Sequence, residues 1–218
     1  AGAPQVASQR LTVSVSPGMG PVLSVMEAWD TLREKGPRRV LPTAVPALMP
    51  NAPAATVGIE LGAHGGIHAP VSACASGAEA IAYGADLIAL GRADIVVAGG
   101  TDAALHPMTV AAFGAMRALS TRNADPQTAS RPFAPDRDGF VLGEGAGLLV
   151  LERAAHAKAR GARILAVLAG SGVTADAYDV ARPEPSGAQQ ERALRLALER
   201  AGLAPGAVGH VNAHATST

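Results

Sequence analysis

The chain has 218 residues, 48% apolar and only 3% aromatic, and its 18 Lys and Arg residues balance its 18 Asp and Glu residues. This length allows one large domain or two small ones, with a core of Ala, Val, Leu and Ile. Because there is no net charge to attract nucleic acid or anionic lipid, we expect neither as a partner. The sequence has no apolar run of membrane-spanning length and no leader pattern, which predicts a soluble, cytoplasmic protein.

The first third of the chain alternates between strand and helix patterns. Residues 11–16 alternate as a strand does, and apolar residues recur at helical spacing over 22–36. The segment 41–53 holds four prolines, which predicts an extended or interface arm without regular helix. A short helix is predicted over 53–63 and a strand over 67–73.

The same alternation continues through the middle of the chain. A helix is predicted over 75–91, and a buried strand over 93–102 that turns on a glycine pair. Residues 107–117 are predicted to be helical and 118–139 to form a long polar loop. Residues 139–153 predict two strands around a glycine-rich turn.

Four more elements complete the pattern. Helices are predicted over 154–162 and 187–202, and strands over 163–176 and 206–215. Strands that alternate with helices are typical of α/β layers with buried sheets. The chain begins with Ala1 rather than Met and ends without a polar tail, so we expect both ends to be cut.

The only cysteine, Cys74, lies between the predicted strand 67–73 and the predicted helix 75–91. A single cysteine forms no intramolecular disulfide, and no Cys/His cluster has the spacing of a zinc site. Two interpretations stay open. Cys74 is either a small buried apolar residue or a nucleophile activated at a helix N-terminus, with small residues after it leaving room for substrate and oxyanion.

A second candidate site is HVNAHATST, residues 210–218. His214 follows a strand-like segment, and Thr216 and Thr218 alternate with Ser217, so both threonine hydroxyls can point to one side. A neutral imidazole beside a thiol can donate to a carbonyl oxygen or move a proton. A lone histidine is more often structural, but paired with Cys74 it makes a coherent catalytic hypothesis.

Five stretches together carry a family resemblance: VSACASGAEAIA (71–82), GPRRV with Pro42 (36–42), FGAMRALSTRN (113–123), SRPFAPDRDGFVLGEGAG (130–147) and HVNAHATST (210–218). In this order and spacing the chain resembles the elongating β-ketoacyl-acyl-carrier-protein synthases, thiolase-fold condensing enzymes of fatty-acid and polyketide synthesis. The sequence around the cysteine is most similar to discrete fatty-acid elongation enzymes, particularly those that extend very long chains in bacteria making mycolic-type acids.

The resemblance implies a decarboxylative Claisen condensation between an acyl thioester and malonyl carrier protein. Cys74 would accept the acyl chain, and His214 would polarise the malonyl thioester as it loses carbon dioxide. Thr216 and Thr218 would bind the phosphopantetheine arm of the acyl carrier protein, which is the expected partner. No redox, nucleotide or metal cofactor is implied.

Other matching positions have weaker implications. Phe113 would border the acyl pocket, although an ordinary core phenylalanine is an equal alternative. Met19 would help to set chain length, with plain packing as the alternative. Asp136, Asp138 and Glu144 lack the spacing of a calcium loop, and we expect them to support the sheet turn and the histidine loop.

The implied fold is a thiolase-like layered αβαβα α/β fold, incomplete at both ends. Residues 1–160 would form part of the N-terminal half with the nucleophile, and 161–218 the start of the C-terminal half. The family's second histidine and lysine would lie beyond Thr218, so we expect these residues alone to be inactive. A homodimer joined through the strand beside the nucleophile is implied, with the 41–53 arm near its interface.

Three alternatives share this fold. The first is the ketosynthase subunit of a type II polyketide synthase. The second is a catalytically incomplete partner resembling a chain-length factor, which usually lacks the cysteine. The third is a degradative thiolase, whose motifs around the nucleophile and second histidine differ from HATST.

Overall fold

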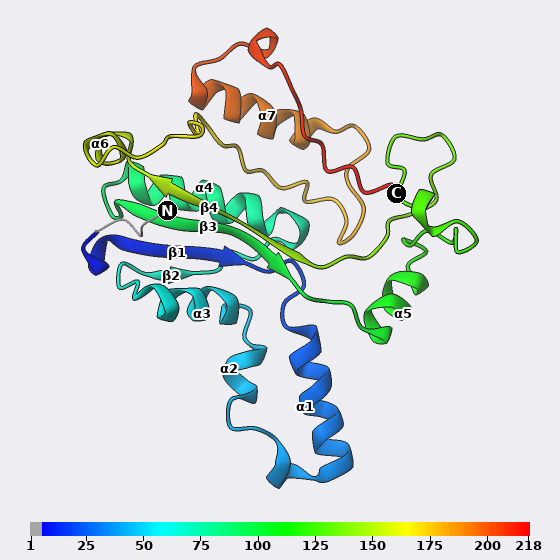
Figure 1. The fold of residues 1–218 in the computed structure, drawn as a ribbon. Coiled ribbons are helices and arrows are strands. Elements are labelled where there is room, and N and C mark those ends of the chain that lie inside the picture. Colours follow the sequence, from blue (N-terminus) through cyan, green and yellow to red (C-terminus); the bar gives the residue numbers. More distant parts are fainter. Residues whose placement is uncertain (1–5) are drawn as a thin grey trace.

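The computed structural model describes residues 6–218 (Figure 1). Its centre is one mixed sheet with the strand order β2-β1-β3-β4. Strands β1 (Leu11–Ser16), β2 (Ile67–His68) and β3 (Ile95–Asp102) run parallel, and β4 (Gly145–Glu152) pairs antiparallel to β3. The structure is therefore the mixed α/β arrangement that the sequence predicts.

Helices cover both faces of the central strands. Helix α3 (Ala52–Leu61) packs over Val13 and Val15, and α4 (Ser76–Ala89) packs over β3 on the opposite face (Figure 1). Because side chains alternate along a strand, the hydroxyl residues of β1 point away from α3. Both faces of β1 are consequently buried.

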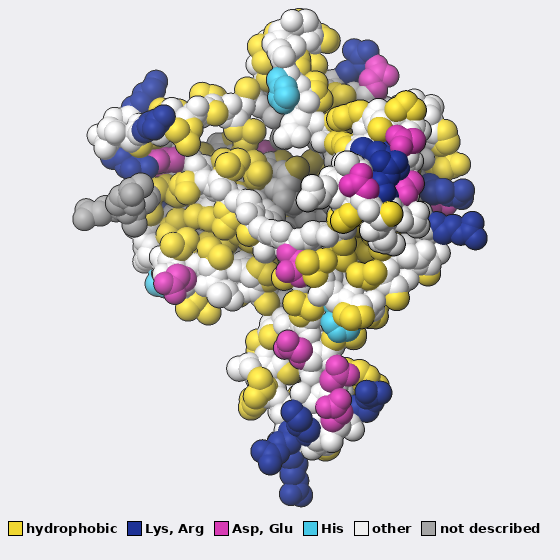
Figure 2. Space-filling model, turned by 45° about the vertical axis from the view of Figure 1, so that its right-hand side comes forward, with side chains coloured by type: hydrophobic (Ala, Val, Ile, Leu, Met, Phe, Trp, Pro, Cys, Tyr) yellow, Lys and Arg dark blue, Asp and Glu magenta, His cyan; other side chains and the backbone are white. Residues whose placement is uncertain are grey.

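The remaining helices lie around this centre. Helix α1 (Val22–Lys35) and the short α2 (Ala44–Leu48) form a lobe that projects from the sheet (Figure 1), and basic side chains gather at its tip (Figure 2). The other elements are α5 (Pro107–Ala115), α6 (Ala154–Ala159), α7 (Ala188–Ala201) and 3-10 turns at Ser8–Arg10, Pro37–Arg39, Ala73–Ala75, Pro126–Thr128 and Pro205–Ala207. Among the described residues, no helix has the length and apolarity needed to cross a membrane.

Most of the predicted elements are confirmed. Strand β1 has its predicted bounds, and α1, α4, α5 and α7 lie within two residues of theirs at each end. The predicted polar loop after α5 is also present, and its only helical part is the 3-10 turn Pro126–Thr128.

The prediction that 41–53 contains no regular helix is wrong in part. Residues Ala44–Leu48 form α2, and α3 already begins at Ala52. Pro46 and Pro53 lie within the first turns of these helices, where backbone N–H groups have no intrahelical partner to lose.

Several strand predictions are also wrong. Segments 163–176 and 206–215 form no hydrogen-bonded strand with any described residue, and 139–153 contains one strand, β4, rather than two. The predicted strand 67–73 is reduced to the two residues of β2. An apolar alternating pattern predicts burial, but a strand also needs a neighbouring strand to which its backbone can hydrogen-bond. Leu165 and Val211, in the two segments without such a neighbour, have exposed fractions of 83% and 68%.

A substitution at Gly99 in β3 tests how tightly this sheet is built. Its φ of +154° disfavours any side chain, and an added Cβ would overlap the Gly147 carbonyl oxygen on β4. We expect Gly99→Ala to lower the free energy of unfolding by about 3 kcal/mol or more, measured by denaturant titration.

Gly114→Ala is the matched control, because a Cβ at this helical glycine meets no atom within 4 Å. It should raise the free energy of unfolding by about 0.5–1 kcal/mol. Equal effects of the two substitutions would contradict the tight β3–β4 contact.

Candidate functional site

Cys74 lies in the 3-10 turn Ala73–Ala75, directly before α4. The buried Ser76 side chain shapes this turn: its hydroxyl donates to the Ala73 carbonyl oxygen at 2.7 Å and accepts the Ser72 N–H at 2.8 Å. Ala73 takes a left-handed φ of +52°. Cys74 itself is exposed among the described residues.

The position of this turn depends on a close approach between α4 and β3. A Cβ added at Gly77 would lie 3.2 Å from the Gly100 Cα, closer than most such contacts. The start of α4 therefore lies at the carboxyl ends of β1 and β3, the edge where open α/β sheets bind ligands. The positive end of the α4 dipole favours an anion beside this turn.

Met19 lies in a neighbouring turn that Asp102 holds in place. The carboxylate of Asp102, at the end of β3, accepts the N–H of Gly18 at 2.7 Å and the N–H of Met19 at 3.1 Å. A Cβ added at Gly18 would lie 3.3 Å from the Ala73 carbonyl oxygen. The structure thus brings the Met19 turn against the Cys74 turn.

A cavity of about 410 Å³ adjoins this turn. Six of the residues that line it are Pro17, Leu23, Ala47, Pro53, Thr101 and Asp102. It lies between the end of β1 and the projecting lobe of α1 and α2, and its lining is mostly apolar. The hollow is open to the surface, and none of Cys74, Met19 and Phe113 lines it.

The polar loop after α5 is organised by carboxylates paired with hydroxyls and arginines. Asp138 accepts the Ser120 hydroxyl at 2.6 Å and the Thr121 N–H at 3.0 Å, and Arg131 lies 3.0 Å away. These hydrogen bonds, with the charge of Arg131, lower the pKa of Asp138 to about 2. The Arg122 hydrogen bond likewise lowers the pKa of Asp136.

These contacts are structural supports, as the sequence predicts for the carboxylates. Glu144 has the same kind of role, since its side chain accepts the Leu105 N–H at 2.7 Å. Within residues 6–218, no group of three His, Cys, Asp or Glu side chains could hold a metal ion.

The chain segment that carries His214 joins the same loop. Ser217 accepts the Arg131 N–H on its hydroxyl at 3.1 Å and the Gly139 N–H on its carbonyl oxygen at 2.9 Å. The hydroxyls of Thr216 and Thr218 lie 2.7 Å apart. His214 is exposed, and no hydrogen bond within residues 6–218 joins its imidazole to the Cys74 thiol.

Phe113 connects α5 to the polar loop that follows it. Its half-buried ring packs edge-to-face on Phe140, with the ring centroids 5.0 Å apart. Phe140 in turn exchanges backbone hydrogen bonds with Ala118 and Ser120 at the start of the loop. Phe113 is thus linked through Phe140 to the loop that holds Ser217.

All these parts lie at one end of the molecule. In Figure 1, β1 and β3 point toward α5, the polar loop and the C-terminal residue Thr218. Figure 2 turns this end toward the viewer and shows that the surface is hollowed there. Sequence reasoning missed Ser76, Asp102 and Ser217 as the residues that organise this end. Of these, only Asp102 had a visible signal, an acidic residue directly after a buried strand.

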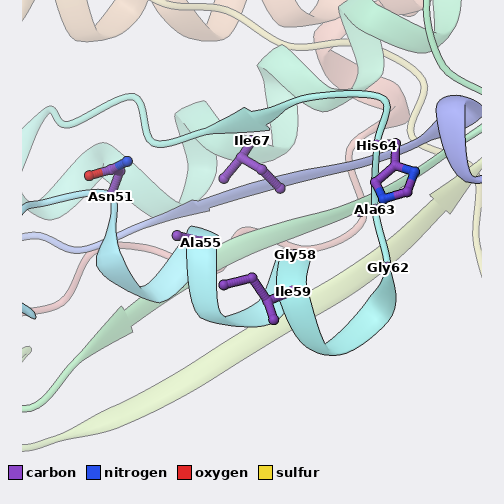
Figure 3. A pocket seen from close by; sticks show the side chains of 8 residues that line it. All are labelled: Asn51, Ala55, Gly58, Ile59, Gly62, Ala63, His64 and Ile67. Atoms are coloured by element: carbon purple, nitrogen blue, oxygen red, sulfur yellow. The ribbon is translucent and has the colours of Figure 1, made fainter. Parts of the chain in front are cut away.

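A second hollow lies between α3 and the edge strand β2 (Figure 3). Its lining includes Gly58, Ile59, Ala63 and Ile67, and its one histidine, His64, lies 3.1 Å from the Ser8 hydroxyl. The residues that line it include no cysteine, serine or carboxylate.

Comparisons with known proteins identify the family of the chain. The family models for the β-ketoacyl synthase N-terminal and C-terminal domains match residues 1–157 and 165–218. The chain is 47% identical over its full length to 3-oxoacyl-[acyl-carrier-protein] synthase 2 of Mycobacterium tuberculosis H37Rv and 44% identical over 94% of its length to that of Rhizobium meliloti. It spans about half the length of these curated relatives, 52% and 49% respectively.

Solved structures give the same result. A β-ketoacyl synthase from Burkholderia phymatum STM815 superposes with a TM-score of 0.90 at 40% identity, covering 100% of this chain and 53% of that one. A type II polyketide ketosynthase, solved with its acyl-carrier protein and bound to the hexaketide, superposes with a TM-score of 0.91 at 32% identity, covering 98% of this chain and 54% of that one. These likenesses establish the thiolase-like fold.

The low pKa of Asp138 makes a prediction about acid stability. A carboxyl whose pKa falls from 3.8 to about 2 on folding stabilises the protein fully above pH ~4 and loses that contribution as the pH falls toward 2. We therefore expect Asp138→Asn to lower the urea midpoint at pH 7, with the difference from wild type shrinking between pH 4 and 2.

Asp86→Asn is the control, because Asp86 is exposed on α4 and makes no side-chain hydrogen bond within residues 6–218. Its urea midpoints should run parallel to those of the wild type over the same pH range. An Asp138→Asn curve that also runs parallel would show that this carboxylate contributes nothing to acid sensitivity.

Proposed function

Because the chain belongs to the β-ketoacyl synthase family, we propose that the protein it forms part of catalyses the decarboxylative condensation of an acyl thioester with malonyl carrier protein. The observation that carries this proposal is the placement of the exposed Cys74 turn at the start of α4, at the carboxyl edge of the sheet. The HATST segment is anchored to the loop 131–139. The product is a β-ketoacyl carrier protein.

The reaction has two halves. The Cys74 thiolate attacks the acyl-carrier thioester, the bond from the acyl carbon to the carrier sulfur breaks, and the free carrier leaves with a proton. Malonyl carrier then loses carbon dioxide by cleavage of its carboxyl–carbon bond, and the resulting enolate carbon bonds to the acyl carbon held on Cys74. The bond from that acyl carbon to the Cys74 sulfur breaks, which releases the β-ketoacyl carrier and regenerates the thiolate. His214 donates to the thioester carbonyl oxygen during decarboxylation, and Thr216 and Thr218 bind the phosphopantetheine arm.

The acyl chain would leave Cys74 past Met19 and Phe113. The Met19 turn touches the Cys74 turn, and the cavity of about 410 Å³ adjoins it. An unbranched methionine side chain can move aside for a longer chain, so its size and mobility would limit chain length.

Fatty-acid elongation is favoured over polyketide synthesis. The curated relatives at 44–47% identity are named 3-oxoacyl synthases, whereas the type II polyketide ketosynthase superposes at 32% identity. A catalytically incomplete partner is disfavoured because Cys74 is present. Neither half-reaction needs a metal, redox or nucleotide cofactor.

The acyl carrier protein is the proposed partner, since both substrates are thioesters of its phosphopantetheine. The relative solved with its acyl-carrier protein supports this choice. We also propose a cytoplasmic location, where a single catalytic thiol stays reduced.

A homodimer through the edge of β2 is the proposed assembly. The order β2-β1-β3-β4 leaves one edge of β2 without a described partner. Val71, which follows β2 and precedes the Cys74 turn, is 51% exposed. The short helix α2 exposes Val45 and Leu48, and Met49 directly after it is also exposed. An unpaired edge beside apolar surface is a natural contact between two copies.

The two halves would meet near residue 160, with 1–160 carrying the nucleophile and 161–218 starting the second half. The two matched family models support this division. Leu149, Val150, Leu165 and Val167 are each more than half exposed, and we propose that further strands and helices of the second half cover them. The second histidine and the lysine would lie there too.

Replacing Cys74 tests the first half-reaction. Full-length wild-type protein incubated with a long-chain acyl carrier should gain the mass of one acyl group per chain, mapped to Cys74. Cys74→Ala should gain none and should lose condensation activity by at least about 10³-fold, as expected for loss of a nucleophile. Absence of the mass gain in the wild type would contradict the synthase function.

Replacing Met19 tests chain-length control. Met19→Phe should slow transfer of acyl chains of twelve or more carbons by roughly 10-fold and leave four-carbon chains within about twofold, because a rigid ring cannot move aside. The measurement is the turnover rate of the wild type and of Met19→Phe with both the short and the long acyl carriers. Equal slowing of short and long chains would indicate a packing role alone.

A further inference from the structure

Ser217 differs from its neighbours in the segment that carries His214. It is 2% exposed, whereas Thr216 is half-buried and His214 and Thr218 are exposed. Its φ of +72° is left-handed, a conformation that a non-glycine residue adopts only when its surroundings hold it there. A buried serine with a left-handed φ, between the half-buried Thr216 and the exposed Thr218, needs a structural explanation.

The explanation lies in its hydrogen bonds. The Ser217 hydroxyl accepts the Arg131 N–H at 3.1 Å, and the Ser217 carbonyl oxygen accepts the Gly139 N–H at 2.9 Å. Both ends of the loop 131–139 are therefore attached to this one residue. The Arg137 side chain adds a bond to the Thr218 carbonyl oxygen at 2.9 Å.

The loop that receives Ser217 is itself rigidly supported. A Cβ added at Gly139 would lie 2.6 Å from the Ala118 carbonyl oxygen and 2.6 Å from the Ser120 nitrogen, so the chain is tightly packed there. Asp138 binds Ser120, Thr121 and Arg131. Ser217 is consequently joined to a fixed part of the N-terminal half.

We propose that Ser217 is a positioning residue, which anchors segment 214–218 to the loop 131–139 and thereby places the His214 imidazole and the two threonine hydroxyls relative to Cys74. This inference rests on the proposed condensation. It differs from the roles assigned above because the buried Ser217 would act through its neighbours and not by contact with substrate. Its loss should affect decarboxylation, which uses His214, and spare acyl transfer to Cys74.

The test uses full-length protein with Ser217→Ala and Ser217→Gly. Both remove the hydroxyl, but glycine also relieves the left-handed strain, so it provides a folded variant if alanine is unstable. We expect both to slow decarboxylation of malonyl carrier by roughly 10-fold while Cys74 acylation stays within about twofold, since small misplacements of catalytic groups are costly. Hydrogen exchange of the 211–218 peptide should rise in both variants.

Ser130→Ala is the matched control, since Ser130 is exposed next to Arg131 and its side chain makes no hydrogen bond within residues 6–218. It should leave both half-reactions and the exchange unchanged. Equal loss of acylation and decarboxylation in the Ser217 variants, or wild-type decarboxylation in them, would overturn the positioning role. If the wild type shows neither half-reaction, the proposed function fails, and unchanged 211–218 exchange in the variants would separately refute the anchor.

Discussion

The close approach of α4 to β3 at Gly77 and Gly100 is the constraint on which the candidate site depends. A Cβ added at Gly77 would lie 3.2 Å from the Gly100 Cα, and one added at Gly100 would lie 3.0 Å from the Gly77 Cα, so a side chain on either residue would push the two backbones apart. It brings the start of α4 against the carboxyl end of β3, where Asp102 then holds the Met19 turn. The position of the Cys74 turn therefore depends on the close contact between Gly77 and Gly100, neither of which has a side chain.

A second set of contacts extends the site away from the sheet. The loop after α5 has few apolar side chains to bury, so its conformation depends on charge pairing and hydrogen bonds. Asp138 and Asp136 accept hydrogen bonds from several parts of the loop. Arginines and hydrogen-bond donors favour their ionised forms and lower their pKa values. The Phe113–Phe140 ring pair ties the loop to α5, and Ser217 ties it to the terminal segment.

These two sets of contacts have different mechanical consequences. Backbone packing of α4 on β3 leaves little freedom, because protein interiors are close-packed. The anchor at Ser217 depends on two hydrogen bonds in a partly exposed loop, so it can be weakened without unfolding the sheet. The Cys74 turn therefore depends on backbone packing, whereas the His214 segment depends on hydrogen bonds to the loop 131–139.

The sequence alone determined the elements with strong local signals and the candidate residues with a chemical signature. The alternation over 11–16, the helical spacing over 187–202 and the single cysteine at a strand–helix junction needed no tertiary information. The five motifs likewise identified the family, because each is local and their order is preserved.

Only the tertiary structure decided which extended segments become strands and which residues organise the site. Residues 163–176 have a strand pattern, yet strand formation depends on a neighbour far away in the sequence that the described residues do not supply. Ser217 accepts hydrogen bonds from residues about eighty positions earlier, so nothing near it in the chain reveals that contact. The sequence shows residue types and local spacing, whereas strand partners and hydrogen bonds between distant residues can be seen only in the folded chain.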